Sequence, residues 1–265
     1  MQNTFDFTDL LRLIDERSTA FRAVVASAPD LDAQVPSCPE WKLFDLVRHL
    51  GGGDRFWAAI VAAGPADGPP AGAAEARAAL VVPREREALA AWLDESTRQL
   101  LDALREAGPD AGCWAWWEEV QSPLTAGTVA RHRVQETTVH TYDAQLALGE
   151  PQPLPEEVTL DGLEEFLTTC VATAAAWPHK PAVLDFRTTE GPVWRLTLDG
   201  SGARVTLLPA GAEAADQDPA AAWAGLHGTA GELVLALYDR IPLDSLRVDG
   251  DAALWDQLRD WDPTA

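Results

Sequence analysis

One stretch of this chain, residues 131–148 (RHRVQETTVHTYDAQLAL), constrains its fold most strongly because four metal-binding types of side chain fall on one helical row. His132, Glu136 and His140 are spaced by four residues, and Asp143 follows three residues later. At about 3.6 residues per turn, these spacings place side chains on one face of a helix. On its own, the Glu136 and His140 pair is typical of an ordinary helix surface. A metal centre with three protein ligands needs another ligand from elsewhere in the chain, so the fold has to bring one to this helix.

Three earlier segments also have helical periodicity, with apolar side chains recurring at spacings of three and four. Thr8, the Ser37-x-x-Glu40 spacing and Ser122 are the expected N-caps of the first, second and fourth helices. Four long helices in succession predict an antiparallel four-helix bundle, in which metal sites are built from inward side chains on facing helices. The expected spans are 8–27, about 37–63, 85–107 and about 123–148.

The second of these helices supplies a candidate for the missing ligand. His49 lies at the edge of its apolar stripe and is expected to point partly inward. The glycines at 51–53 follow, and each costs roughly 1 kcal/mol relative to Ala inside a helix. Either close approach of another group compensates for them, or the helix breaks and restarts at Asp54. Residues 63–79, rich in Gly, Pro and Ala, are expected to form a surface loop.

From residue 155 the pattern changes to a mixture of helices and strands. Turn signals at Glu190-Gly191 and Asp199-Gly200 separate three strand-like runs, which predict an antiparallel meander. We therefore expect an α+β two-domain fold, with a bundle over residues 1–152 and a small α+β domain with a short antiparallel sheet over 153–265. The expected helices of the second domain span 156–177, 230–239 and 252–260, and the strands span 182–187, 193–198, 203–208 and 246–248.

Composition excludes some partners. The net charge of −22 and the pI of about 4.4 argue against nucleic acid and anionic membrane surfaces. No secretion signal and no apolar stretch near the ~18–20 residues of a membrane span are found, so we expect a cytoplasmic protein. Three widely separated cysteines suit neither a disulfide framework nor a Cys-x-x-Cys zinc site.

Three motifs together resemble one known family: SCPEW at 37–41, DLVRHLGG at 45–52 and HRVQETTVHTYDA at 132–144. They resemble the mycothiol-dependent maleylpyruvate isomerase family, whose N-terminal domain is a DinB-like helical bundle. LRVDGDA at 246–252 is similar to that family's small C-terminal α+β domain. The resemblance implies a divalent metal, most often zinc, bound by His49, Glu136 and His140. It also implies mycothiol, the low-molecular-weight thiol of actinobacteria, as cosubstrate.

The activity implied by the resemblance is attack of a thiolate, activated by the metal, on a small-molecule electrophile. In a maleylpyruvate-type reaction, addition, rotation and elimination convert a cis double bond to the trans isomer. In an S-transferase, as in relatives that act on other electrophiles or in specialised metabolism, the thiol stays attached. Two other classes remain open. Two histidines and a carboxylate also suit iron(II) oxygen chemistry, and a non-catalytic metal-binding or ligand-binding module can keep the same residues.

Further side chains are candidates for supporting roles. Asp143 can orient a ligand histidine or simply lie on the helix surface, and His132 is expected to be an outer or solvated group. A structural role is expected for Cys38. Trp116, in the CWAWW segment at 113–117, and Arg240 are candidate contacts of substrate or thiol. Core packing for the tryptophan and compensation of a helix dipole for the arginine are the ordinary alternatives.

Overall fold

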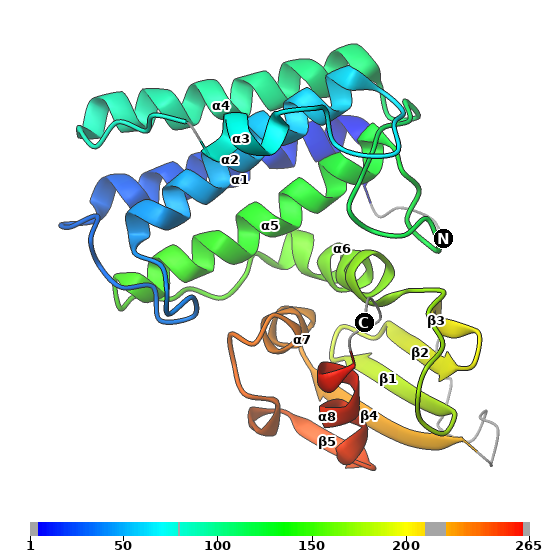
Figure 1. Cartoon of the computed structure of the whole chain (residues 1–265). Coiled ribbons are helices and arrows are strands. Elements are labelled where there is room, and N and C mark those ends of the chain that lie inside the picture. Colours follow the sequence, from blue (N-terminus) through cyan, green and yellow to red (C-terminus); the bar gives the residue numbers. More distant parts are fainter. Residues whose placement is uncertain (1–4, 79, 210–220, 262–265) are drawn as a thin grey trace. The chain divides into compact units, whose positions relative to one another are not determined.

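The computed structural model describes residues 5–78, 80–209 and 221–261, which form two compact units (Figure 1). The first contains the chain up to Trp116 together with Leu124–Leu154, and the second contains Trp117–Pro123 and the chain from Pro155 onward. The division into domains 1–152 and 153–265 stays a prediction. Among the described residues, no helix has both the length and the apolar character needed to cross a membrane.

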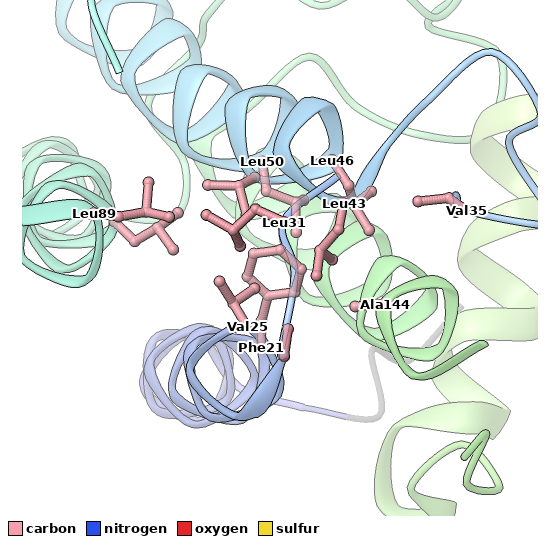
Figure 2. Packing of buried hydrophobic residues seen from close by; sticks show 12 residues of the cluster. Phe21, Val25, Leu31, Val35, Leu43, Leu46, Leu50, Leu89 and Ala144 are labelled. Carbon is pink, nitrogen blue, oxygen red and sulfur yellow. The ribbon is translucent and has the colours of Figure 1, made fainter. Parts of the chain in front are cut away.

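Four long helices build the first unit, as the sequence predicts. Phe21 and Val25 of α1, Leu46 of α2 and Leu89 of α4 belong to one buried cluster, which Ala144 of α5 completes (Figure 2). The helices are α1 (Phe7–Ser27), α2 (Leu43–Ala63), α4 (Arg86–Ala107) and α5 (Ala126–Ala147), with a short α3 (Ala73–Ala78) beside α2.

The first two helix starts differ from the prediction. The N-cap of α1 is Asp6 rather than Thr8, and its carboxylate accepts a hydrogen bond from the N–H of Asp9. The second helix begins only after Lys42, because residues 37–41 form a turn that Lys42 closes by pairing with Gln34 in a β-bridge. Ser37 is therefore outside the helix and available for another role.

The predicted start of α5 was also wrong. Thr125, not Ser122, is its N-cap, and the Thr125 hydroxyl accepts from the N–H of Thr128. The Ser122 hydroxyl instead lies 2.8 Å from the Thr169 hydroxyl within the second unit. The expected loop at 63–79 also contains a helical segment, α3.

The glycines of α2 lie inside an unbroken helix, so the predicted alternative of a break at Asp54 is wrong. A Cβ atom on Gly51 would lie 2.1 Å from the Trp92 ring. A Cβ atom on Gly53 would lie 3.2 Å from Nη1 of Arg133. Close approach of large side chains therefore explains two of the three glycines.

The second unit combines helices with one five-stranded sheet in the order β3-β2-β1-β4-β5. The predicted meander of β1, β2 and β3 is confirmed, but β4 was missed and pairs parallel to β1, so the sheet is mixed rather than antiparallel. The expected helix at 156–177 ends early, because Thr173 pairs with Ala203 in a β-bridge. The elements are α6 (Glu156–Phe166), a π-helical turn (Leu167–Val171), β1 (Ala182–Thr188), β2 (Val193–Asp199), β3 (Gly202–Leu207), β4 (Ala222–Gly228), α7 (Ala230–Leu237), a 3-10 turn (Leu243–Ser245), β5 (Arg247–Gly250) and α8 (Ala253–Asp260).

Candidate metal centre

Two helices of the bundle bring three metal-binding side chains together. His49 comes from α2, and Glu136 and His140 come from α5, and one ligand atom from each lies within 4.8 Å of the other two. Oε1 of Glu136 is 2.7 Å from Nε2 of His49 and 4.0 Å from Nε2 of His140. The two imidazole rings are 4.9 Å apart between centroids. His49, the candidate ligand from the second helix, therefore lies beside Glu136 and His140 of α5.

This donor set fits a divalent transition metal. Two imidazole nitrogens and one carboxylate oxygen form a ligand set of catalytic zinc sites, which keep a fourth position open. Atoms bound to zinc at about 2.0–2.1 Å lie at most about 4.2 Å apart, so small side-chain movements suffice to close the site. The three residues can therefore hold one ion.

A buried carboxylate orients one of the histidines. Oδ2 of Asp143 lies 2.8 Å from Nδ1 of His140, and Asp143 has no exposed surface. The Ser37 hydroxyl donates to Oδ1 of Asp143 at 2.5 Å, and Sγ of Cys38 lies 3.9 Å from Oδ2. Because a carboxylate accepts hydrogen bonds, Nδ1 of His140 donates to Asp143, and Nε2 is the ring nitrogen that faces Glu136.

The protonation states of Glu136 and His49 also suit metal binding. Burial by itself would raise the pKa of Glu136, but the charge of Arg133 and the hydrogen bond from His49 hold that pKa well below its ordinary range. Burial lowers the pKa of His49, against the opposing effect of the Glu136 carboxylate. An ionised carboxylate and a neutral imidazole are the forms that bind metal.

One indole ring lies against the cluster, and another lies against its neighbour His132. Trp41 lies 4.7 Å from the His49 ring and 6.0 Å from the His140 ring. Trp116, which is 51% exposed, lies 5.6 Å from the ring of the buried His132. His132 itself reaches Oε2 of Glu136 at 3.5 Å, so it is an outer neighbour of the cluster rather than a solvated group.

A cavity of about 540 Å³ opens beside His49. Its walls carry both signs of charge, and Nη2 of Arg77 lies 3.3 Å from Nδ1 of His49. Such a cavity offers room and polar contacts for a small molecule next to the cluster. Its lining residues are Glu40, Trp41, Asp45, Arg48, His49, Phe56, Ala74, Arg77, Ala78, Leu80 and Val82.

Reasoning from sequence missed Trp41 and Arg77 as neighbours of the site. Trp41 lies inside the SCPEW motif, which was the available signal, whereas Arg77 lies in the segment expected to be a loop. Arg240, a candidate contact, belongs to the second unit, where its Nη1 donates to the Tyr238 carbonyl at 2.5 Å. A role of Arg240 in binding stays a prediction.

Comparisons with known proteins agree with this architecture. Two solved structures, of the mycothiol-dependent maleylpyruvate isomerase and of a mutant of it, each match with a TM-score of 0.60 at 16% identity over 95% of this chain and 98% of theirs. At that identity the likeness shows a shared fold. No protein of curated function matches significantly in sequence. Residues 11–145 match the mycothiol maleylpyruvate isomerase N-terminal domain, and residues 157–257 match the C-terminal domain of the same proteins. Because these two matches span most of the chain, it belongs to the mycothiol-dependent maleylpyruvate isomerase family.

Proposed function

We propose that this protein is an enzyme that uses a divalent metal, with zinc the first choice, and mycothiol to convert a small electrophile by cis-trans isomerisation of the maleylpyruvate type. His49, Glu136 and His140 hold the metal in this proposal. The observation that carries it is the convergence of their three ligand atoms within 4.8 Å, in a chain that belongs to this family.

The residues of the chain prepare the site for this chemistry. A divalent metal on these ligands supplies a Lewis acid that lowers the pKa of a thiol, so that thiolate is available at neutral pH. Asp143 fixes the tautomer of His140 through the 2.8 Å contact with its Nδ1. Burial holds His49 in the neutral form by lowering its pKa. The Trp41 ring, 4.7 Å from His49, packs against that side of the cluster.

The reaction then needs no net consumption of thiol. The thiolate sulfur forms a bond to one carbon of the cis double bond, and the π electrons move to the conjugated carbonyl oxygen. Rotation follows about the carbon–carbon bond that has become single, and the return of the electron pair expels the thiolate and leaves the trans double bond. Arg48 and Arg77 are the cationic groups of the mixed-charge cavity beside His49, and in this proposal they pair with the carboxylates of the electrophile.

Metal content is the first test. Wild type, His49→Ala and Glu136→Ala are compared by elemental mass spectrometry after dialysis against micromolar zinc. His179→Ala, which removes a histidine of the second unit, is the matched control. We expect about one zinc per chain in wild type and control, and little zinc in the other two variants. A folded Glu136→Ala protein with stoichiometric zinc would contradict the metal assignment.

Activity is the second test. The zinc-loaded protein is incubated with mycothiol and maleylpyruvate, and the products are separated by liquid chromatography with mass spectrometry. A trans isomer that requires catalytic amounts of thiol supports the proposal. A stable thioether indicates an S-transferase, and retention of ligand without turnover across a panel of electrophiles indicates a binding module. In a parallel sample loaded with iron(II) instead of zinc, oxygen uptake without thiol indicates iron(II) chemistry.

A further inference from the structure

The two carboxylate oxygens of Glu136 face different surroundings. Oε1 faces the two histidines of the cluster, at 2.7 Å from His49 and 4.0 Å from His140. Oε2 accepts a short hydrogen bond from Nη1 of Arg133 and lies 3.5 Å from Nε2 of His132. A carboxylate can bind a metal through one oxygen or through both. In this protein, the second oxygen already has a charged partner.

The guanidinium of Arg133 also pairs with a second carboxylate, that of Asp54. The Arg133 side chain is 1% exposed, and its Nε and Nη2 donate to Oδ1 of Asp54 at 3.2 and 2.8 Å. Oδ2 of the same aspartate accepts from the Thr97 hydroxyl at 3.1 Å. The guanidinium therefore bridges Asp54 of α2 and Glu136 of α5, and the hydroxyl of Thr97 on α4 holds the Asp54 carboxylate in place.

The helix backbone is shaped for this bridge. A Cβ atom at position 53 would lie 3.2 Å from Nη1 of Arg133, the nitrogen that contacts Glu136. Nη2 of Arg133 also lies 3.4 Å from the Leu50 carbonyl oxygen in the same helix. Glycine at this position keeps space for the guanidinium against α2. A buried arginine presents a planar fork of five donors that can satisfy both carboxylates at once, whereas a lysine offers three donors on a single nitrogen and no such fork.

We infer that Arg133, held by Asp54, is a positioning residue that occupies Oε2 of Glu136 and so reserves Oε1 as the one oxygen that this carboxylate offers to a metal. The inference rests on the proposed metal site. Single-oxygen binding leaves one more coordination position for the thiol than two-oxygen binding does. Arg133 thereby acts on the reaction through Glu136, without contact to the reactants.

Zinc affinity is the first readout. The dissociation constant of Zn²⁺ is measured by competition with a chromophoric chelator for wild type, Arg133→Met, Arg133→Lys and Asp54→Asn. Arg98→Met, which removes an exposed arginine paired with carboxylates on α4, is the control. Loss of an outer-shell partner typically weakens metal binding 10–100-fold. We expect that range for Arg133→Met, a smaller loss for Arg133→Lys and Asp54→Asn, and no change for Arg98→Met.

The second readout is the coordination number of the bound metal, which would not change in Arg133→Met if Arg133 had a purely structural role. Cobalt(II) replaces zinc, and its visible absorption weakens as the coordination number rises. We expect weaker bands in Arg133→Met, because Oε2 becomes free to bind, while circular dichroism confirms the fold. A folded Arg133→Met protein with wild-type zinc affinity and an unchanged cobalt spectrum would overturn the inference.

The two milder variants test the inference if Arg133→Met fails to fold. If Arg133→Met does not fold, Arg133→Lys and Asp54→Asn decide by the same two measurements, and wild-type values in both would reject the inference. Failure of the metal site itself has a different signature. Wild type then binds no metal, or Glu136→Ala keeps it, whereas failure of the inference alone leaves wild-type binding intact and dependent on Glu136.

Discussion

Each unit of this protein buries a cluster of arginine and carboxylate side chains, but the two clusters have opposite proportions. In the bundle, one guanidinium, Arg133, lies between the carboxylates of Asp54 and Glu136. In the second unit, one carboxylate, Asp185 on β1, lies between the guanidiniums of Arg187 and Arg195. Both central groups are buried, at 1% and 0% exposure.

The hydrogen-bond partners of each carboxylate oxygen determine whether that oxygen is available to a metal. Oδ1 of Asp185 accepts from Nε of Arg195, and Oδ2 accepts from Arg187, Arg195 and the Trp223 indole at 2.8 to 3.2 Å. Burial by itself would raise the pKa of Asp185, but these donors keep it below its ordinary value. Both oxygens are thus engaged by donors of the sheet.

Glu136 differs because only Oε2 is engaged by the arginine, while Oε1 faces two imidazoles. Two carboxylates around one arginine also leave an excess of negative charge, which favours a divalent cation nearby. A buried ion cluster therefore becomes a candidate metal site when one of its carboxylates keeps an oxygen directed away from the arginine.

The largest expected effect is on stability and comes from the second unit. Asp185→Ala leaves two guanidiniums around a site without an anion, and breaking a buried pair in this way costs about 3–5 kcal/mol. Glu136→Ala leaves Arg133 paired with Asp54, so we expect a loss of about 1 kcal/mol. Urea unfolding in the presence of a chelator measures both values. The predicted effects on zinc are reversed, with binding kept in Asp185→Ala and lost in Glu136→Ala.

Equal losses of stability in the two variants would contradict this distinction. Asp102→Ala, which removes an exposed carboxylate that pairs with Arg98 and Arg105 on α4, provides the baseline for a surface ion pair. Its expected cost is at most about 1 kcal/mol.

Asp143 shares one feature with each cluster. Both of its oxygens accept hydrogen bonds, as those of Asp185 do, but one of its donors, His140, is a proposed metal ligand. Asp143→Asn keeps the shape of the side chain but weakens its hold on the Nδ1 proton of His140. We expect zinc affinity to fall 10–100-fold with little change in the unfolding midpoint. Chelator competition measures the first quantity and urea unfolding the second. Unaltered affinity in a folded variant would show that Asp143 is a structural group only.

Several of these features could be predicted from sequence because they depend on periodicity. The spacing of four between His132, Glu136 and His140 predicts their common face, and the position of His49 at the edge of an apolar stripe predicts that it points partly inward. The strands β1 to β3 were also predictable, since turn residues separate their apolar runs. By contrast, β4 has the sequence AWAGLHG, which lacks β-branched residues, and it takes its place through pairing with β1 on one side and β5 on the other.

Other features depend on partners that are distant in the chain. Ser37 looks like a helix cap but donates to Asp143, 106 residues away. Arg133 and Asp54 look like surface charges on two helices, and only the packing of α2 against α5 shows that they are buried together. Local propensity carries no information on such pairs, so reasoning from sequence assigned them no role.

The smallest expected effect is a difference in stability and zinc affinity between alanine variants of two neighbouring glycines of α2. Alanine in place of glycine inside a helix gains up to about 1 kcal/mol. A Cβ atom on Gly52 would make ordinary contacts, at 3.5 Å from Leu80 and 3.6 Å from Arg77. A Cβ atom on Gly53 would instead crowd Nη1 of Arg133 at 3.2 Å. We expect Gly52→Ala to be stabilising with unchanged zinc affinity, and Gly53→Ala to gain less stability and to bind zinc a few-fold more weakly. Urea unfolding and chelator competition on the two variants side by side measure the difference. Identical behaviour would mean that the guanidinium tolerates displacement, and the contact between Arg133 and Glu136 would then be looser than the bundle geometry indicates.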